Sequence, residues 1–328
     1  MPAFAPEPFS EGVVSPETAS LFRRTPYISP EEYKRAPTAV AVNNLVPGGS
    51  EEEQLAALTD IISRASDMVD TICFHRPDGT LAACPSTESA WVKPRDNQSL
   101  LLQCNFKPVL EVIGMALGLG YSSMQNIGDT ASKALTINGR IIQLPGSVGG
   151  RGPSTFFPTV PLVNGRVLVV WTYVNGFPHT TLAKEVEKEE TSIEVEPSVP
   201  EANPIYGVYP GTQLTIHDGA ATEVVVVSSV EGLTLNLTSQ LRFEHKVPTY
   251  PNVTRVSAVP WDAEQACILL ISYLIKTRGS RAQVIPASPS KSSTHPKQAP
   301  GQAGADKDLA AAEAMLKHYS VPYLRSNA

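Results

Sequence analysis

The sequence predicts an α+β protein, in which a helical bundle formed by N- and C-terminal segments carries a large inserted antiparallel β domain of barrel or sandwich type. Apolar residues recur at helical spacing near both ends of the chain, whereas the middle alternates with a period of two between hairpin turns. A Pro-rich stretch precedes both patterns. We expect four regions: an extended N-terminal arm with a short helix (1–46), the first part of the helical domain (47–97), the inserted β domain (98–259) and the second part of the helical domain (260–328).

Composition narrows the functional classes. The chain has 328 residues, is 42% hydrophobic and carries a formal charge of -6, so it can bury a sizeable core but lacks the excess of Lys and Arg typical of nucleic-acid binders. Its four cysteines form no CxxC pair and no zinc spacing, so we expect reduced thiols and no metal or other cofactor. The start has no basic-then-apolar leader and no run suits a membrane span, which predicts synthesis and use in a cytoplasm.

Two capping boxes mark helix starts in the first part of the chain. Ser29 with Glu32 opens a short helix that carries proline at its first position, and Pro37 ends it. Ser50 with Glu53 opens the longest predicted helix, over residues 50–72. Its apolar residues recur every three or four positions, which predicts one stripe that packs on another helix.

The partner of that stripe is predicted in the last third of the chain. The segment after Asp262 is apolar almost all round and ends with Lys276, Arg278 and Gly279, as a central helix of a bundle would. We therefore expect the two segments to meet in a helical hub. The hub residues are predicted to include Leu58, Ile62, Met68, Leu270 and Leu274.

The β domain is predicted from its turns. Asn138-Gly139 and Asn164-Gly165 separate pairs of apolar, β-branched runs, and both residues tolerate the positive φ that a two-residue hairpin requires. Asp218-Gly219 and Glu231-Gly232 separate further short strands. Short antiparallel strands at this spacing indicate a small barrel or sandwich.

A long Pro/Ser/Lys-rich tether, residues 279–304, joins the central helix to a last helix over residues 306–319. Closing the tether costs roughly 3 kcal/mol, while burial of Leu309, Met315 and Leu316 returns about 1.5–3 kcal/mol each. The last helix can therefore dock, and because a helix of this length is marginal alone, it needs either its own body or a neighbouring subunit to lie on.

The sequence gives no sign of catalysis. Its six histidines are scattered, and neither a nucleophile elbow nor a Cys–His signature occurs, so we expect a protein that is not an enzyme. One alternative stays open. Trp171, Tyr173 and Phe177 lie near an Asn-Gly turn, where they could stack on a sugar ring in a carbohydrate-binding β module, although aromatic strand residues are more often core.

Several phrases of the sequence resemble head-to-tail connector (adaptor) proteins of long-tailed bacteriophages. They are the helix over 50–72 before a β region, the strand phrases at 104–112 and 209–216, and the helix–loop–helix that starts at 259 and ends near Pro322. The resemblance covers residues 50–323. Simpler members of that family consist mainly of the helical bundle, so the large β insertion and the arm are departures.

The resemblance implies a structural virion protein at the neck, assembled in the cytoplasm of the bacterial host. Such proteins form a homo-oligomeric ring, a dodecamer in this family, that docks on the portal protein, extends the DNA channel and presents a surface to a stopper or tail-side neck protein. Genomic double-stranded DNA passes through without sequence-specific binding, and no membrane takes part. The resemblance assigns portal or subunit contacts to Leu309, Met315, Leu316, Tyr319 and Tyr323, and a channel- or portal-facing loop to Lys291, His295 and Lys297.

Overall fold

The long helix α3, Glu51–Phe74, forms where the sequence predicted it. The Ser50 hydroxyl accepts the Glu53 amide at 3.3 Å, and the Glu53 carboxylate accepts the Ser50 amide at 2.8 Å, so the predicted capping box is confirmed. The shorter box is confirmed as well, because Ser29 and Glu32 cap α2, Pro30–Arg35, in the same reciprocal way. One face of α3 is buried from Leu58 to Phe74.

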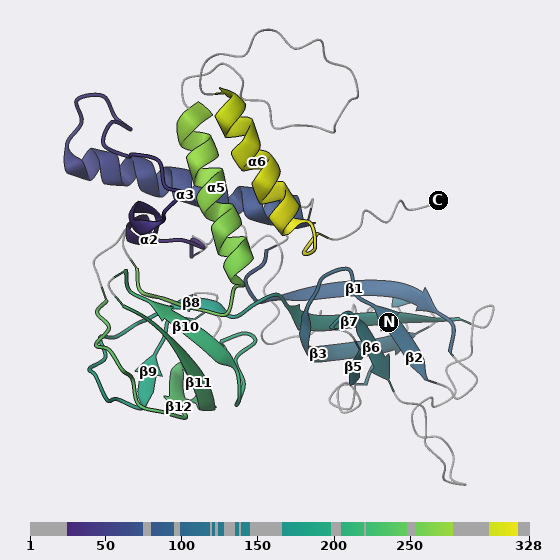
Figure 1. Cartoon of the computed structure of the whole chain (residues 1–328). Coiled ribbons are helices and arrows are strands. Elements are labelled where there is room, and N and C mark those ends of the chain that lie inside the picture. Colours follow the sequence, from purple (N-terminus) through teal and green to yellow (C-terminus); the bar gives the residue numbers. More distant parts are fainter. Residues whose placement is uncertain are drawn as a thin grey trace, which may run out of the picture.

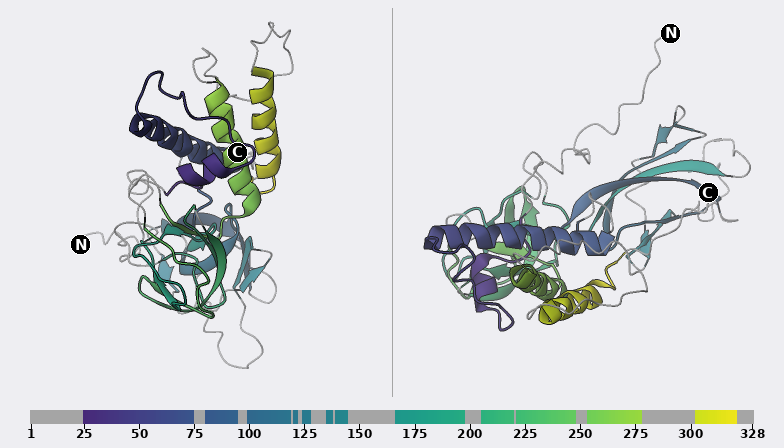
Figure 2. Two further views of the ribbon diagram at one scale, coloured as in Figure 1. Left: turned by 60° about the vertical axis from the view of Figure 1, so that its left-hand side comes forward. Right: turned by 90° about the horizontal axis from the view of Figure 1, so that it is seen from above.

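This computed structural model describes residues 25–74, 80–94, 99–118, 120–121, 124–127, 135–137, 139–144, 166–197, 205–219, 221–247, 253–277 and 302–320. Within them, helices from both ends of the chain meet. Helices α5, Trp261–Thr277, and α6, Gln302–Leu316, lie side by side, and α3 packs across them (Figure 1). The helical hub, by which we mean α2, α3, α5 and α6, confirms the predicted bundle, and the view from above shows α3 spanning its length (Figure 2).

The first part of the β region is the sheet lobe, residues 84–176. Its main sheet has the order β1-β7-β3-β4, and a smaller sheet has the order β2-β6-β5. The strands are β1 (Cys84–Val92), β2 (Leu100–Gln103), β3 (Val109–Gly118), β4 (Gln125–Asn126), β5 (Leu135–Ile137), β6 (Ile141–Leu144) and β7 (Val167–Asn175). The hairpin at Gly139, which has φ 61°, is confirmed by the pairing of β5 with β6. The predicted turn at Asn164-Gly165 lies outside the described residues.

The second part is the barrel, residues 177–258, with strand order β8-β13-β10-β11-β12-β9. The strands are β8 (His179–Thr181), β9 (Ser192–Glu194), β10 (Gln213–His217), β11 (Thr222–Glu231), β12 (Thr234–Leu237) and β13 (Arg255–Ser257). A bridge between Leu182 and Val195 joins the two outer strands, and the Glu196 amide donates to the Thr181 carbonyl at 2.8 Å. The six strands therefore curl round one interior. The hairpins at Gly219 and Gly232 form as predicted.

The two β lobes bury their apolar faces in different cores. On β7, Val167, Val169, Trp171 and Tyr173 alternate onto one face and join the same hydrophobic cluster as α3 and α5. The barrel instead has its own cluster, which includes Leu214, Val225 and Val256. The sheet lobe is thus an extension of the hub core, whereas the barrel lies beside it as a separately filled unit (Figure 1).

Candidate functional site: interaction surfaces and the junction that positions them

A buried arginine fastens the barrel to the hub. Arg255 on β13 is fully buried and makes a forked contact with Glu32 of α2, at 2.8 Å from Nε and 2.5 Å from Nη2. Its Nη1 donates to Glu264 of α5 at 3.0 Å. A paired guanidinium matches two carboxylates in this planar geometry. Glu32 is 223 positions from Arg255 and Glu264 only 9, so this side chain joins α2 to the consecutive elements β13 and α5.

The same junction shifts several pKa values. Burial acts to raise the pKa of Glu32, but the charge of Arg255 outweighs it and the pKa is lowered. For Glu264 burial outweighs Arg255, and the pKa is raised. His217, 3.3 Å from the Glu32 carboxylate, has its pKa lowered to about 4 by burial and by the positive charge of Arg255. This imidazole is therefore neutral at pH 7.

His179 closes the junction on the N-terminal side. Its Nδ1 lies 2.9 Å from the Ser257 hydroxyl and its Nε2 lies 3.1 Å from the Thr25 carbonyl. The carbonyl can only accept, so Nε2 carries the proton in this arrangement. Burial and the nearby Arg255 lower the pKa of His179 to about 3. A neutral histidine thus ties the first described residues to the barrel.

Tyr27 ties the same segment to α3. Its hydroxyl donates to Asp70 at 2.6 Å, and the Leu81 amide donates to the same carboxylate oxygen at 2.9 Å. Burial and the negative charge of Asp70 raise the pKa of Tyr27 well above its usual value. The entry into the sheet lobe is therefore fixed against the end of the long helix.

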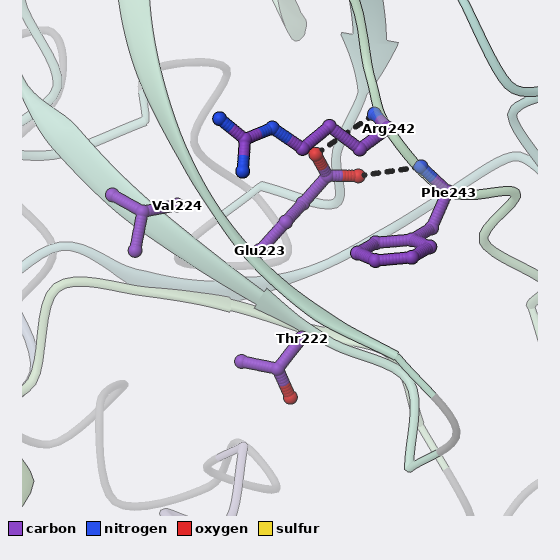
Figure 3. Close-up of a pocket in the computed structure, with 5 residues that line it drawn as sticks. All are labelled: Thr222, Glu223, Val224, Arg242 and Phe243. Atoms are coloured by element: carbon purple, nitrogen blue, oxygen red, sulfur yellow. Dashed lines mark hydrogen bonds between the residues drawn. The ribbon is translucent and has the colours of Figure 1, made fainter.

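A buried histidine shapes the outer surface of the barrel. His245 is fully buried, with Nδ1 3.0 Å from Asp218 and Nε2 2.8 Å from Glu223. Glu223 also accepts the backbone amides of Arg242 and Phe243, at 3.0 and 3.3 Å (Figure 3). Both imidazole nitrogens are occupied, and the ring has no access to an outside ligand. We therefore interpret the cluster as structural, because it holds in place the segment that carries Phe243.

Beside this cluster the surface is hollowed. A hollow of about 280 Å³ is lined by Thr222, Glu223, Val224, Arg242 and Phe243 (Figure 3). Val224 is 64% exposed and Phe243 45% exposed, although both are apolar. Within the described residues, no three His, Cys, Asp or Glu side chains are grouped to hold a metal ion. The hollow therefore offers apolar contacts from Val224 and Phe243 next to the charged side chains of Glu223 and Arg242.

Large exposed apolar side chains occur on the sheet lobe and on the hub as well. On the sheet lobe, Trp91 is 44% exposed and Tyr121 is 65% exposed, and on the hub Trp261 is 73% exposed. Aromatic residues of this kind are enriched at protein–protein interfaces. Each of the three parts of the molecule thus presents at least one aromatic contact residue.

The residues that the sequence singled out for the hub come together. Leu58, Ile62 and Leu270 are fully buried in one cluster, and Met68 and Leu274 pack half-buried against it. Their recurrence at helical spacing was a sufficient signal. The sequence does not reveal the ion pairs of Arg255, because Glu32 is 223 positions away and nothing in the local pattern marks Glu264 as the second partner. The only local sign was a cation inside an otherwise uncharged strand.

The predicted portal or subunit contacts lie mostly against their own chain. Leu316 is fully buried in the hub core, and Leu309, Met315 and Tyr319 are half-buried against it. The sequence leaves open whether the last helix lies on its own chain or on a neighbouring subunit. In the structure, α6 docks on α5 of its own chain. The Tyr319 hydroxyl donates to Asp262 at 2.6 Å. The other predicted residues lie outside the described part of the chain: Tyr323, Lys291, His295 and Lys297.

The aromatic residues proposed for sugar stacking do not lie where that hypothesis requires them. Trp171 is 2% exposed and Tyr173 is fully buried, since both point into the shared core of hub and sheet lobe. Phe177 packs edge-on against Tyr319. The prediction that Trp171 and Tyr173 stack on a sugar is therefore wrong, because the face of β7 that carries them is covered.

Comparisons with known proteins place the chain in no family. No family model matches it, and no curated protein matches it. Among solved structures, it is similar to the tailspike of Acinetobacter baumannii bacteriophage AP22, in complex with A. baumannii capsular saccharide. The sequences are 22% identical over 25% of this chain, the match spans 15% of the tailspike chain, and the TM-score is 0.19. At that TM-score the two do not share an overall fold. In the described residues, no helix has the length and apolar character needed to cross a bilayer.

Proposed function

We propose that this chain is a structural virion protein, a head-to-tail connector that assembles into a ring and works by packing against its neighbours. The observation that carries the proposal is the hub, in which helices from both ends of the chain close over one core while the β lobes project from it. The helical bundle is the part that the resemblance to connector proteins implies, and the β lobes are an addition to it. The protein acts without catalysis.

The distribution of contact residues supports a protein that binds on several sides. The hub and the sheet lobe share one core and the barrel has its own, yet Trp91, Phe243 and Trp261 remain exposed, each on a different part. A solvated aromatic side chain loses favourable burial unless a partner covers it. A ring subunit needs such surfaces for two sister copies, for the portal and for the stopper or tail-side neck protein.

The hub is the part that we assign to the portal. Trp261 begins α5 and is the most exposed of the large apolar side chains of the described residues. The half-buried Leu309, Met315 and Tyr319 form the adjoining edge of α6. The loop with Lys291, His295 and Lys297 connects these two helices, so it starts and ends on this same part.

The charge of the chain suits a channel through which DNA slides. With a net charge of -6, the protein does not neutralise phosphates and release counterions, which is the main source of non-specific DNA affinity. Genomic double-stranded DNA would pass a ring of such subunits without being gripped.

Native mass spectrometry of the purified chain, with and without portal protein, tests the proposal. We expect a ring of about twelve copies, as the family resemblance implies, either alone or on the portal. Trp261→Ser should weaken portal attachment, while Glu52→Ser, on the exposed start of α3, should leave it unchanged. A chain that stays monomeric or trimeric under both conditions and retains a glycan would overturn the proposal in favour of a tail or baseplate carbohydrate-binding module.

A further inference from the structure

A closed ring of identical subunits imposes a specific demand on this chain. Rotation about the ring axis places one surface of each copy against a different surface of the next, so every subunit needs two complementary surfaces that do not overlap. The following inference rests on the proposed ring. The structure supplies one such surface on the sheet lobe and another on the barrel.

The sheet-lobe surface consists of Ser89, Trp91, Lys93, Tyr121 and Arg166. Strand β1 pairs with β7 without a bulge, so the odd-numbered residues of β1 share one face. The Ser89 hydroxyl lies 2.8 Å from the Tyr121 hydroxyl, which fixes the tyrosine next to Trp91. Lys93 and Arg166 are exposed just beyond the paired ends of β1 and β7. The result is an aromatic pair bordered by two cations.

The barrel surface consists of Glu187, Glu190, Val224, Phe243 and Glu244. The segment with Glu187 and Glu190 runs beside the segment with Phe243 and Glu244, since the Val186 and His245 backbones exchange two hydrogen bonds of 3.0 Å. Val224 of β11 lines the same hollow as Phe243. All five residues are exposed. The result is an apolar pair next to the hollow, bordered by the carboxylates of Glu187 and Glu190 and by Glu244, which pairs with Lys246 at 3.2 Å. Arg242 also lines the hollow.

The charges of the two lobes are complementary. Residues 84–176 contain seven basic and four acidic side chains, whereas residues 177–258 contain five basic and eleven acidic ones. The lobes therefore carry opposite net charge within one chain. Opposite potentials favour an approach in which the sheet lobe of one copy faces the barrel of another, and they disfavour like-with-like contacts.

The two surfaces also point in directions that suit a head-to-tail contact. Strand β1 runs away from the barrel, so Trp91 lies near the free end of the sheet lobe (Figure 1). Val224 follows the β10–β11 turn, where Gly219 approaches Glu31 of α2. The barrel that carries this turn and the free end of the sheet lobe lie on opposite sides of the molecule (Figure 1). A single copy cannot bring both surfaces together, whereas two copies can.

We infer that the Trp91–Tyr121 surface of each copy packs on the Val224–Phe243 surface of the next copy. The aromatic pair covers the exposed valine and phenylalanine and fills the hollow beside them. Lys93 and Arg166 face the barrel carboxylates. The partner is thus a second copy of this chain, bound through two unlike surfaces.

Complementation of two variants tests this inference. Trp91→Ser with Tyr121→Ser removes the sheet-lobe surface, and Val224→Ser with Phe243→Ser removes the barrel surface. Each of these side chains is at least 44% exposed, so thermal unfolding should stay close to that of the wild type. We expect each double variant alone to lose the ring and to raise the concentration for half-assembly at least about 10-fold. A mixture of the two, with one isotopically labelled, should give dimers that contain one chain of each kind.

The outcomes separate the inference from the proposed function. If both double variants assemble like the wild type, or if one alone forms dimers and the mixture adds none, the two-surface contact is refuted while the ring stands. A wild-type chain that is monomeric with and without portal protein refutes the ring, and the contact with it. Ile113→Ser is the matched control, because it removes an equally exposed apolar side chain from β3 and should leave assembly unchanged. If the ring forms only on the portal, all variants are measured there.

Discussion

Acidification should destabilise this protein well above the pH at which carboxylates titrate, because the buried His179 and the half-buried His217 resist protonation. The pKa of His179 is lowered to about 3 and that of His217 to about 4, whereas both titrate near 6.5 in the unfolded chain. Between these values the unfolded state binds more protons than the folded state. The stability due to the two histidines is therefore complete above about pH 6.5 and is lost as the pH falls toward 4 and 3.

The size of the effect follows from the same values. At pH 5 an unfolded-state pKa of 6.5 and a folded-state pKa of 3 to 4 give a loss of about 2 kcal/mol per histidine relative to pH 8. Urea unfolding at pH 8 and pH 5 would then differ by about 4 kcal/mol in the free energy of unfolding. Glu264, whose pKa is raised, works in the opposite direction over part of this range. The comparison with variants is therefore more decisive than the wild-type value alone.

The variants are His179→Gln and His217→Gln, singly and together. Each single variant should remove about half of the pH-dependent loss, and the double variant most of it, whatever its stability at pH 8. A wild-type free energy that is flat from pH 8 to pH 5, or a slope that persists in the double variant, would refute the reasoning.

Other predictions concern the hub and the thiols. Leu270→Ala should lower the free energy of unfolding by about 2–5 kcal/mol through the cavity it leaves, measured by urea titration; a loss below 1 kcal/mol would mean that the site is not packed as described. Asp70→Ala should cost about 1.5–3 kcal/mol because a buried hydroxyl and amide lose their acceptor, while the exposed Asp67→Ala should be neutral, and equal effects would contradict the contact. Burial raises the pKa of three thiols to about 12, so alkylation at pH 8, followed by mass spectrometry, should modify them only after unfolding, and labelling of the native protein at the unfolded rate would contradict their burial. The three are Cys73, Cys104 and Cys267.

Local patterns made the helices and hairpins predictable. The capping box at Ser50 and the stripe through Leu58 depend on residues three or four positions apart, and the turn at Gly139 depends on backbone angles that few residues adopt. In each case the interaction that decides the structure lies within one short segment. The prediction therefore needs no knowledge of the rest of the chain.

Contacts between remote segments were not predictable in the same way. Glu32 was interpreted only as a cap, yet it also binds Arg255, 223 positions away. Alternation in β7 indicated which residues share a face, but not whether that face meets the hub or solvent. For this reason the sequence leaves Trp171 as a candidate sugar-stacking residue, whereas the structure places it in the core. The sequence likewise predicts a single β domain and not its division into two lobes.

The shared hub has a consequence for how the chain is made. The apolar stripe of α3 leaves the ribosome with the first quarter of the sequence, but α5, which covers it, begins about 190 residues later. At the usual rates of translation that interval is on the order of 10–40 s. During it Leu58 and its neighbours lack the cover of α5, so the nascent protein exposes part of an apolar helix to the cell. Chaperone contact in this window is the natural safeguard against premature aggregation.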